Sequence, residues 1–372
     1  MTLPAISVII PLYNAEKYIG DCLESLLTQT FQDFEVIVVD DCSTDNSLAV
    51  VESYAQKFNG RLKLAAPEKN SGGGGYIPRN IGLNLSCGEY VFFVDADDFL
   101  MEFALEKLFA AAQNFNVDVV YISAYYSYGE PEEVKLALDA QGKDFFRKKI
   151  EDKPTLTINA PNENFQKLFF GGEWFHMPWS KFVRRNFLID NGIVFPKILS
   201  GGDFIWTIQV LYYAKRLLRL PLPIYFYRKN AVGSVTNKRK KSPHEQISDC
   251  VKAFLLGAEA LRELSTRIDL LRRQDYFSAA LTPFFNNCLK RSFDERMQME
   301  TQEICEILAR EFDGDSSKFI LPFLFGALDA QQKSFVALKT QVDELEKSAR
   351  QDKAYIAELE KFIAHSAVKA EE

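Results

Sequence analysis

The chain of 372 residues predicts an α/β fold with a doubly wound, mostly parallel, Rossmann-like sheet. Short apolar runs alternate with amphipathic helical patterns from residue 5 to about residue 122, the order typical of parallel strands joined by helices. Two of the apolar runs end abruptly in carboxylates, at Asp40-Asp41 and at Asp95-Ala96-Asp97-Asp98. Because ligands of such sheets bind outside the carboxyl ends of the strands, these observations predict one binding edge.

The individual elements follow from the hydrophobic periodicity. Runs rich in Val, Ile and aromatic residues predict strands at 5–10, 34–39, 61–66, 90–94 and 117–122. Apolar residues that recur every three or four positions predict helices at about 15–29 and 102–114. Two more helices are expected between these. Ser43 is the expected N-cap of one, and Pro78 stands in the first turn of the other.

The pattern changes beyond about residue 125. Residues 129–164 are polar and poorly periodic, which is typical of an insertion, whereas 165–235 contain enough aromatic residues to be ordered again. We expect an α/β domain over 1–235, followed by a helical region over 236–330.

A heptad pattern predicts a C-terminal coiled-coil helix over 331–372. Burial of such a stripe between chains predicts a homo-oligomer through this segment; the alternative is that the stripe folds back on the helical region. Eight apolar residues and one Asp occupy the seam: Phe335, Leu338, Val342, Leu345, Ala349, Asp352, Ile356, Leu359 and Ile363.

Composition narrows the classes of function. Hydrophobic content of 47% and charged content of 26% fit a globular protein with a sizeable core, and a net charge of −7 argues against a nucleic-acid partner. The six cysteines form no CxxC pair and are expected to be free thiols of a reducing compartment. The sequence begins without a basic signal-peptide region and has no apolar run of ~20 residues, so we expect a cytoplasmic protein. The basic run 238–241 predicts a solvated face; the alternatives are closure over a diphosphate or a peripheral contact with anionic lipid.

The carboxylates after the strand at 90–94 are candidate metal ligands. Asp95, Asp97 and Asp98 supply hard oxygen atoms, which suit Mg²⁺ or Mn²⁺ held jointly with a substrate diphosphate. The alternative is a solvated turn, and Asp98 is expected to cap the next helix.

Three other polar features are expected at the same edge. Asp40-Asp41 can accept hydrogen bonds from a nucleobase imide and a ribose, whereas the nearby Asp45 is more typical of a turn or cap. The glycine-rich loop 70–75 lets the backbone approach a ligand, and Arg79 after it offers a charged fork to phosphate. Gly201-Gly202-Asp203-Phe204 places an acid before an apolar helix.

Taken together, these motifs resemble the family 2 glycosyltransferases of GT-A fold, an inverting group that uses nucleotide sugars. The resemblance covers about residues 5–235. It is carried by Ser7-Val8-Ile9-Ile10-Pro11-Leu12-Tyr13-Asn14, Val38-Val39-Asp40-Asp41-Cys42-Ser43-Thr44-Asp45-Asn46-Ser47, Arg79-Asn80-Ile81-Gly82, Asp95-Ala96-Asp97-Asp98 and Trp179-Ser180-Lys181-Phe182-Val183-Arg184-Arg185.

The resemblance implies roles for individual residues. Asp97 would bind the divalent cation and Asp203 would be the catalytic base. Either Asp40 or Asp41 would accept from the uracil imide of a UDP-sugar. The nucleotide-binding set implied in this way is Pro11, Tyr13, Asn14, Asp40, Asp41, Arg79, Asp95 and Ala96.

Two departures from the family pattern stand out. The residue before the base is often Glu in the family and is Gly202 here. The loop before Arg79 usually reads Ala-Arg-Asn after fewer glycines, whereas here four glycines are followed by Tyr-Ile-Pro-Arg-Asn. The first departure concerns the positioning of the base, and the second predicts an altered donor or acceptor edge.

Four residues of the region 174–181 are candidates for acceptor binding: Trp174, His176, Trp179 and Lys181. The tryptophans are either core residues or stack on an acceptor sugar. A structural, hydrogen-bonded role for His176 is more typical than metal ligation.

The expected activity is therefore metal-assisted transfer from a UDP-sugar to a hydroxyl group of a glycan or lipid-linked acceptor, with inversion, in bacterial cell-surface polysaccharide synthesis. The alternatives are a nucleotidyltransferase and an inactive, transferase-like scaffold. A processive synthase is not expected, because membrane helices and a Gln-x-x-Arg-Trp signature are absent from the sequence.

Overall fold

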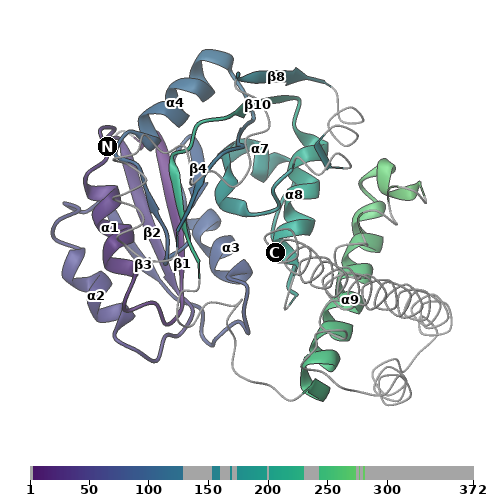
Figure 1. Ribbon diagram of the computed structural model, residues 1–372, viewed down its shortest axis with the longest axis horizontal. Helices are drawn as coiled ribbons and strands as arrows, with labels where there is room; N and C mark the ends of the chain where they lie inside the picture. Colours follow the sequence, from purple (N-terminus) through teal and green to yellow (C-terminus); the bar gives the residue numbers. More distant parts are fainter. Residues whose placement is uncertain are drawn as a thin grey trace, which may run out of the picture. The chain divides into compact units, whose positions relative to one another are not determined.

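The computed structural model describes residues 3–128, 153–159, 168–169, 174–198, 201–229 and 243–273, together with 276 and 280 (Figure 1). The chain divides into two compact units, Met1–Cys288 and Leu289–Glu372, and all described residues belong to the first. The expected coiled coil over 331–372 and the basic run 238–241 lie outside the described residues.

The main sheet has eight strands in the order β3-β2-β1-β4-β9-β6-β10-β8. Its parallel strands include the five expected from the sequence, so the doubly wound, mostly parallel sheet is confirmed. β9 and β8 run antiparallel to their neighbours. The strands are β1 (Ile6–Leu12), β2 (Phe34–Asp40), β3 (Leu62–Ala65), β4 (Tyr90–Phe93), β6 (Val119–Ile122), β8 (Thr155–Ile158), β9 (Lys181–Arg184) and β10 (Arg216–Leu220).

Helices cover both faces of this sheet (Figure 1). On one face, α1 (Ile19–Leu27), α2 (Ser47–Tyr54) and α4 (Ala104–Phe115) bury their apolar stripes against alternate residues of the strands. On the other, α3 (Tyr76–Leu85) packs against β1 and β2, and Trp206 of α8 (Gly202–Tyr213) lies edge-on to Phe93 of β4. The burial of β1 and β2 along almost their whole length follows from this two-sided cover.

A smaller sheet of three strands lies in the order β5-β11-β7. It consists of β5 (Phe99–Leu100), β11 (Tyr225–Arg228) and β7 (Tyr126–Tyr128). β5 begins directly after the carboxylates 95–98, so that β11 is paired beside them. This sheet therefore brings residues near 225 to the carboxyl end of β4.

The remaining described elements are short, with one exception. They are α7 (Arg185–Asp190), the 3₁₀ turns Pro178–Ser180 and Asp269–Arg272, and the long α9 (Pro243–Ser265). α9 falls where helices were expected, and β8 forms within the stretch predicted as an insertion. None of the helices that the structure describes is both long and apolar enough to cross a membrane.

The predicted N-cap at Ser43 is wrong. The Ser43 hydroxyl donates to Asp40 Oδ1 (2.5 Å), and α2 begins only at Ser47. Asp45 instead accepts from the Ser47 N–H (3.0 Å) and the Ser47 hydroxyl (2.5 Å) at Oδ1, which confirms it as a turn residue. The loop between β2 and α2 is thus longer than the sequence reading allowed, because two Asp side chains organise it rather than one Ser.

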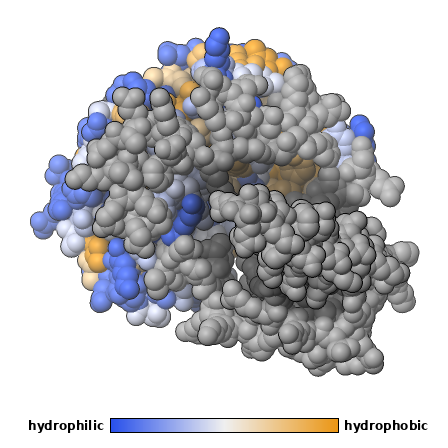
Figure 2. Space-filling model, in the orientation of Figure 1, coloured by the Kyte–Doolittle hydropathy of each residue, from blue (hydrophilic) through white to orange (hydrophobic). Residues whose placement is uncertain are grey.

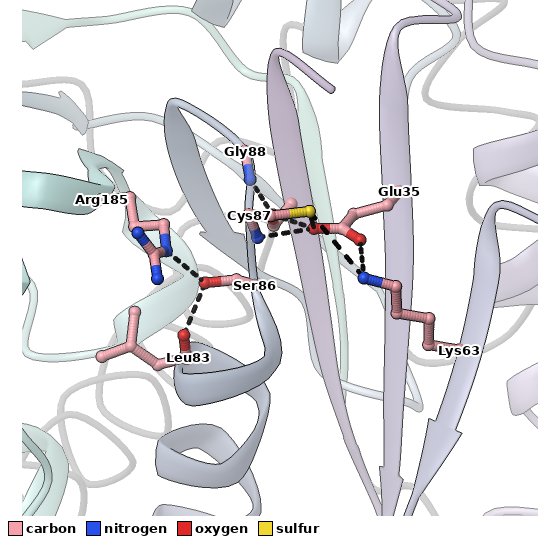
Figure 3. A network of polar contacts seen from close by, with 8 residues as sticks. Glu35, Lys63, Leu83, Ser86, Cys87, Gly88 and Arg185 are labelled. Carbon is pink, nitrogen blue, oxygen red and sulfur yellow. Dashed lines mark hydrogen bonds and ion pairs between the residues drawn. The ribbon is translucent and has the colours of Figure 1, made fainter. Parts of the chain in front are cut away.

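A buried polar network lies at the amino ends of the strands (Figure 3). Glu35 accepts from the Ser7 hydroxyl (2.6 Å), the Cys87 N–H (2.9 Å) and the Lys63 ammonium (2.6 Å). Ser7 in turn accepts from the Gly88 N–H (2.9 Å). The network ties β1, β2, β3 and the start of β4 together at the edge opposite the carboxylates 95–98.

The exposed apolar side chains of the described residues are spread over different elements. Figure 2 shows those on one face as small hydrophobic areas among hydrophilic ones. Single exposed apolar residues of this kind are normal and need no partner. The large ones include Leu64 in β3, Leu85 in α3, Phe115 in α4, Ile158 in β8 and Ile189 in α7.

Candidate active site

The ends of β1 and β2 form the expected nucleobase side of the site. Pro11 lies near the end of β1, and Tyr13 after it is 49% exposed, so its ring is available for stacking. Asn14 adopts a left-handed backbone (φ 50°), and its Oδ1 accepts from the Thr44 N–H (2.7 Å). A hydrogen bond therefore joins the loops that follow β1 and β2, next to the exposed ring of Tyr13.

Asp40 and Asp41 are both buried but differ in their partners. Asp40 accepts from the N–H (3.2 Å) and hydroxyl (2.5 Å) of Ser43, within its own turn. Asp41 accepts from the N–H (2.8 Å) and the hydroxyl (2.7 Å) of Ser71, in the glycine-rich loop. Asp40 therefore holds the β2 turn, and Asp41 fixes the glycine loop to the end of β2.

Arg79 is placed differently from the expectation. Its side chain is buried, and its Nη atoms donate to the Gly74 carbonyl (2.7 Å) and to Asp95 Oδ1 (2.5 Å). The guanidinium expected to clamp phosphate is thus occupied by the loop carbonyl and by Asp95, because helix α3 directs it inward. Arg79 links the glycine loop to the carboxylates of β4.

Asp95 and Asp97 lie at the carboxyl end of β4, with the buried Ala96 between them. Burial, and next the charge of Asp95, raise the pKa of Asp97 to about 6. A carboxylate whose charged form is disfavoured in this way gains most from a nearby cation. Among the described residues, no group of three or more His, Cys, Asp or Glu is arranged to hold a metal ion. The residues fit a divalent cation whose remaining ligands come from a substrate diphosphate.

Asp98 is not the helix cap predicted from the sequence. It is only 1% exposed, and it accepts from the Tyr225 hydroxyl (2.7 Å) and the Arg228 N–H (2.8 Å). Burial, then the charges of Asp97 and Asp95, raise its pKa well above the usual range. The strand β5 intervenes before α4, so Asp98 anchors β11 instead of a helix.

Arg228 is a site residue that the sequence reasoning missed. Its Nε donates to the Asp97 carbonyl (3.0 Å) and its Nη2 to Asp21 Oδ2 (2.9 Å). The guanidinium lies 4.8 Å from the centre of the Tyr18 ring and 5.0 Å from that of Tyr128. The only sequence signal is a basic residue at the end of the aromatic run 225–227, far from the carboxylates in the chain.

Asp203 lies in the first turn of α8, half-buried, and its Oδ1 accepts from the Phe204 N–H (2.9 Å). A carboxylate at a helix N-terminus is stabilised by the helix dipole. His176 is exposed and its ring lies 6.4 Å from that of Phe204. Desolvation by the surrounding protein lowers the pKa of His176, and the charge of the nearby Asp203 opposes this shift.

The structure corrects two of the four acceptor-binding predictions. Trp179 is 1% exposed and stacks on Tyr225 (4.2 Å between ring centres, 7° between planes). Lys181 is 0% exposed, and its ammonium donates to the carbonyls of Phe175 and of Met177 (3.1 Å). Burial lowers the pKa of Lys181 well below its usual range. Lys181 is a core residue because β9 lies in the middle of the sheet. Trp179, in the 3₁₀ turn before β9, is a core residue because Tyr225 and Tyr125 pack against its ring.

Trp174 is also largely buried, with the Lys181 ammonium 4.5 Å from its ring centre. Of the four candidates, His176 is the exposed one. An acceptor contact by His176 stays a prediction.

A doubly wound sheet with paired carboxylates after β4 and an acid at the start of a later helix is the GT-A arrangement of nucleotide-sugar transferases. Residues 7–184 match the model of glycosyl transferase family 2. Residues 7–184 are therefore a glycosyl transferase family 2 domain.

Two curated relatives are poly(ribitol-phosphate) glycosyltransferases. The β-N-acetylglucosaminyltransferase TarS of Staphylococcus aureus (strain MW2) is 34% identical over 260 residues, which cover 68% of this chain and 41% of TarS. The poly(ribitol-phosphate) β-glucosyltransferase of Bacillus spizizenii is 40% identical over 336 residues, or 86% of this chain and 47% of that protein. The chain therefore spans less than half the length of these relatives.

Solved structures give the same picture. A crystal structure of S. aureus TarS 1-349 with UDP-GlcNAc aligns with a TM-score of 0.58 and 27% sequence identity, covering 82% of this chain and 80% of that one. A complex of the same fragment with UDP aligns with a TM-score of 0.56. These similarities favour a glycosyltransferase over a nucleotidyltransferase.

Proposed function

We propose that this chain transfers a sugar from a UDP-sugar to a hydroxyl group of a glycan or lipid-linked acceptor, with inversion, in bacterial cell-surface glycan synthesis. The observation that carries the proposal is the arrangement of three acidic positions around one loop. In loop 70–75, Ser71 donates a hydrogen bond to Asp41, and the Gly74 carbonyl accepts one from Arg79. Arg79 also pairs with Asp95. Tyr76, directly after the loop, lies against the start of α8, which carries Asp203.

The donor side of the proposal rests on the ends of β1 and β2. The exposed Tyr13 ring would stack on the base, and Asp40 or Asp41 would accept from its imide. The TarS fragment crystallised with UDP and with UDP-GlcNAc supports UDP as the nucleotide. The printed activities of the two relatives make UDP-GlcNAc and UDP-glucose the first donors to test, and poly(ribitol phosphate) the first acceptor.

Asp97, with Asp95 beside it, would hold Mn²⁺ or Mg²⁺. Such an ion neutralises the diphosphate and stabilises the charge that the leaving UDP acquires. Arg79 neutralises Asp95 on its other side, at 2.5 Å, and so keeps the two neighbouring carboxylates in place. The backbone of this turn is fixed by β11. Asp98 accepts from Tyr225 and Arg228, and Arg228 donates to the Asp97 carbonyl.

Asp203 is the proposed general base. Its carboxylate takes the proton of the acceptor hydroxyl as the hydroxyl oxygen forms a bond to the anomeric carbon. The bond from that carbon to the diphosphate oxygen breaks, and UDP leaves with the bonding electrons. Attack from the side opposite UDP inverts the configuration.

The test is UDP release from a panel of UDP-sugars, with and without poly(ribitol phosphate), together with NMR of the product's anomeric configuration. The expected result is acceptor-dependent release of UDP and an inverted product. Asp203→Asn is nearly isosteric but cannot accept the proton, so its turnover should fall by a factor of about 10² to 10⁴ while UDP binding is kept. Failure of every donor to give UDP, with a folded chain that does not bind UDP, would support the inactive scaffold instead.

A further inference from the structure

The two departures from the family pattern meet in one contact. Tyr76 follows the four-glycine loop and opens α3, while Gly202 opens α8 directly before Asp203. A Cβ atom on Gly202 would lie 2.9 Å from Cδ2 and Cε2 of the Tyr76 ring. The ring therefore occupies the space that any side chain at position 202 needs.

The glycine loop encloses the other side of the same ring. A Cβ atom on Gly74 would overlap the Tyr76 ring, and Gly74 has a left-handed backbone (φ 71°), which favours glycine for a second reason. The Tyr76 ring is thus held between the backbone of the loop and the first turn of α8. The phenolic oxygen faces the N–H groups of Gly202 and Asp203, which have no partner within the helix.

An aromatic column extends this contact into the core. The Tyr76 ring lies nearly parallel to Phe195 (6.1 Å, 16°), and Phe195 stacks on Trp206 of α8 (4.8 Å, 6°). Asn80 of α3 holds the Phe195 backbone through two hydrogen bonds of 2.9 Å each. Phe195 and Trp206 both meet Phe93 edge-on, two residues before Asp95. The loop, β4 and α8 are therefore joined by one packed unit.

We infer that Tyr76 is a positioning residue that couples the donor-side glycine loop to the turn carrying Asp203. The inference rests on the proposed function, since it takes Asp203 to be the base. The loop is hydrogen-bonded to Asp41 and Arg79, so its position depends on the geometry of the proposed donor site. Through the Tyr76 ring, the same loop sets where the carboxylate of Asp203 stands relative to the sugar. A misplacement of about 1 Å can cost about 10²-fold in rate, which sets the expected effect.

The test is a double-mutant cycle at Tyr76 and Gly202. Gly202→Ala forces a methyl group against the ring and should lower kcat by at least about tenfold. Tyr76→Ala removes the ring and should lower kcat by about 10²-fold, because the turn loses its support. Both single variants should keep the Kd for UDP and the KM for the donor within about twofold. In the Tyr76→Ala background, the further Gly202→Ala change should cost less than twofold, since the methyl group then has room.

Phe58→Ala is the matched control, because it removes a fully buried ring beside Arg61, away from the loop and α8. It should lower the melting temperature without lowering kcat at a temperature where the chain is folded. Suppose that the wild-type chain releases UDP. An unchanged kcat in Tyr76→Ala, or strictly additive effects of the two substitutions, would then overturn the positioning role and leave the proposed function standing. A wild-type chain that releases no UDP from any donor would overturn the proposed function, and the coupling with it.

Discussion

Glu35 and Asp97 are carboxylates at opposite ends of the strands of the main sheet, and their surroundings differ. Glu35 lies at the start of β2, and Asp97 lies in the turn after β4. Glu35, at the amino edge, accepts from Ser7, Cys87 and Lys63 within 3.0 Å (Figure 3). Burial alone would raise the pKa of Glu35, but these hydrogen bonds outweigh it and hold the pKa below its usual value. Burial and the charge of Asp95 instead raise the pKa of Asp97 to about 6.

The difference separates a structural carboxylate from a functional one. The protein satisfies Glu35 completely, so this side chain contributes to stability. Asp97 is left with an excess of negative charge, which costs stability unless a cation or a substrate compensates it. Five measurements test this contrast.

Replacing Asp97 by Ala should give the largest effect. Substitution of residues that merely support a metal ligand costs 10- to 100-fold, so loss of the ligand should lower UDP release by about 10²-fold or more. The melting temperature in EDTA should stay the same or rise, because an unfavourable buried charge is removed. Steady-state UDP release and calorimetry measure the two quantities. A variant that keeps wild-type activity in EDTA would sink the metal assignment.

Replacing Glu35 by Ala should have the opposite profile. The buried Ser7 hydroxyl and the partly buried Cys87 N–H would lose their acceptor, which predicts a loss of about 1–3 kcal/mol in the free energy of unfolding. The turnover number of the folded fraction should not change, since the amino edge is remote from the substrate. Urea unfolding followed by kinetics below the transition tests this. Unchanged stability would mean that the Glu35 network does not hold the amino ends of the strands together.

The pH dependence of stability in EDTA should carry opposite signs for the two residues. The folded pKa of Glu35 is lowered, so its stabilisation is complete above the unfolded value of about 4.3 and is lost as pH falls through the folded pKa. The folded pKa of Asp97 is raised to about 6, so stability should fall as pH rises from about 3.9 to about 6.

Urea titrations from pH 3.5 to 7.5 of the wild type, Glu35→Gln and Asp97→Asn resolve the two limbs. Glu35→Gln should flatten the acid limb, and Asp97→Asn should flatten the decline between pH 4 and 6. The same slope in all three proteins would contradict the assignment of both groups.

Replacing Lys63 by Met should give the smallest effect. The ammonium of Lys63 lies 2.6 Å from Glu35, but its side chain is 46% exposed, so water screens the pair. The expected loss is about 0.5 kcal/mol, well below that for Glu35→Ala. Equal losses for the two variants would show that the ion pair, rather than the hydrogen bonds of Ser7 and Cys87, holds the amino edge.

The sequence predicted what local patterns encode. The five parallel strands follow from their apolar runs, and the position of Asp95 and Asp97 at a strand end follows from the break in such a run. The turn role of Asp45 is equally local. These features require only neighbouring residues, so one sequence suffices to read them.

Contacts between distant residues were not predictable in the same way. Asp98 reads as a helix cap until β11 is paired beside it, because Tyr225 and Arg228 lie about 130 positions further along the chain. Lys181 was an acceptor candidate because its type is polar, yet a central antiparallel strand buries it. The sequence left Trp179 as either core or acceptor residue, and the distant Tyr225 buries its ring. The Tyr76 and Gly202 departures looked independent until the fold placed one ring on the other residue.

The most direct test of the contrast between the edges is calorimetric binding of UDP with and without Mn²⁺. The wild type and Glu35→Gln should both bind UDP at least about tenfold more tightly when Mn²⁺ is present, which corresponds to about 1.4 kcal/mol. Asp97→Asn should lose this gain while it keeps its metal-free affinity for UDP. A gain of equal size in Asp97→Asn would contradict the account, because the carboxylate left unsatisfied at the carboxyl edge would then have no part in binding the cation.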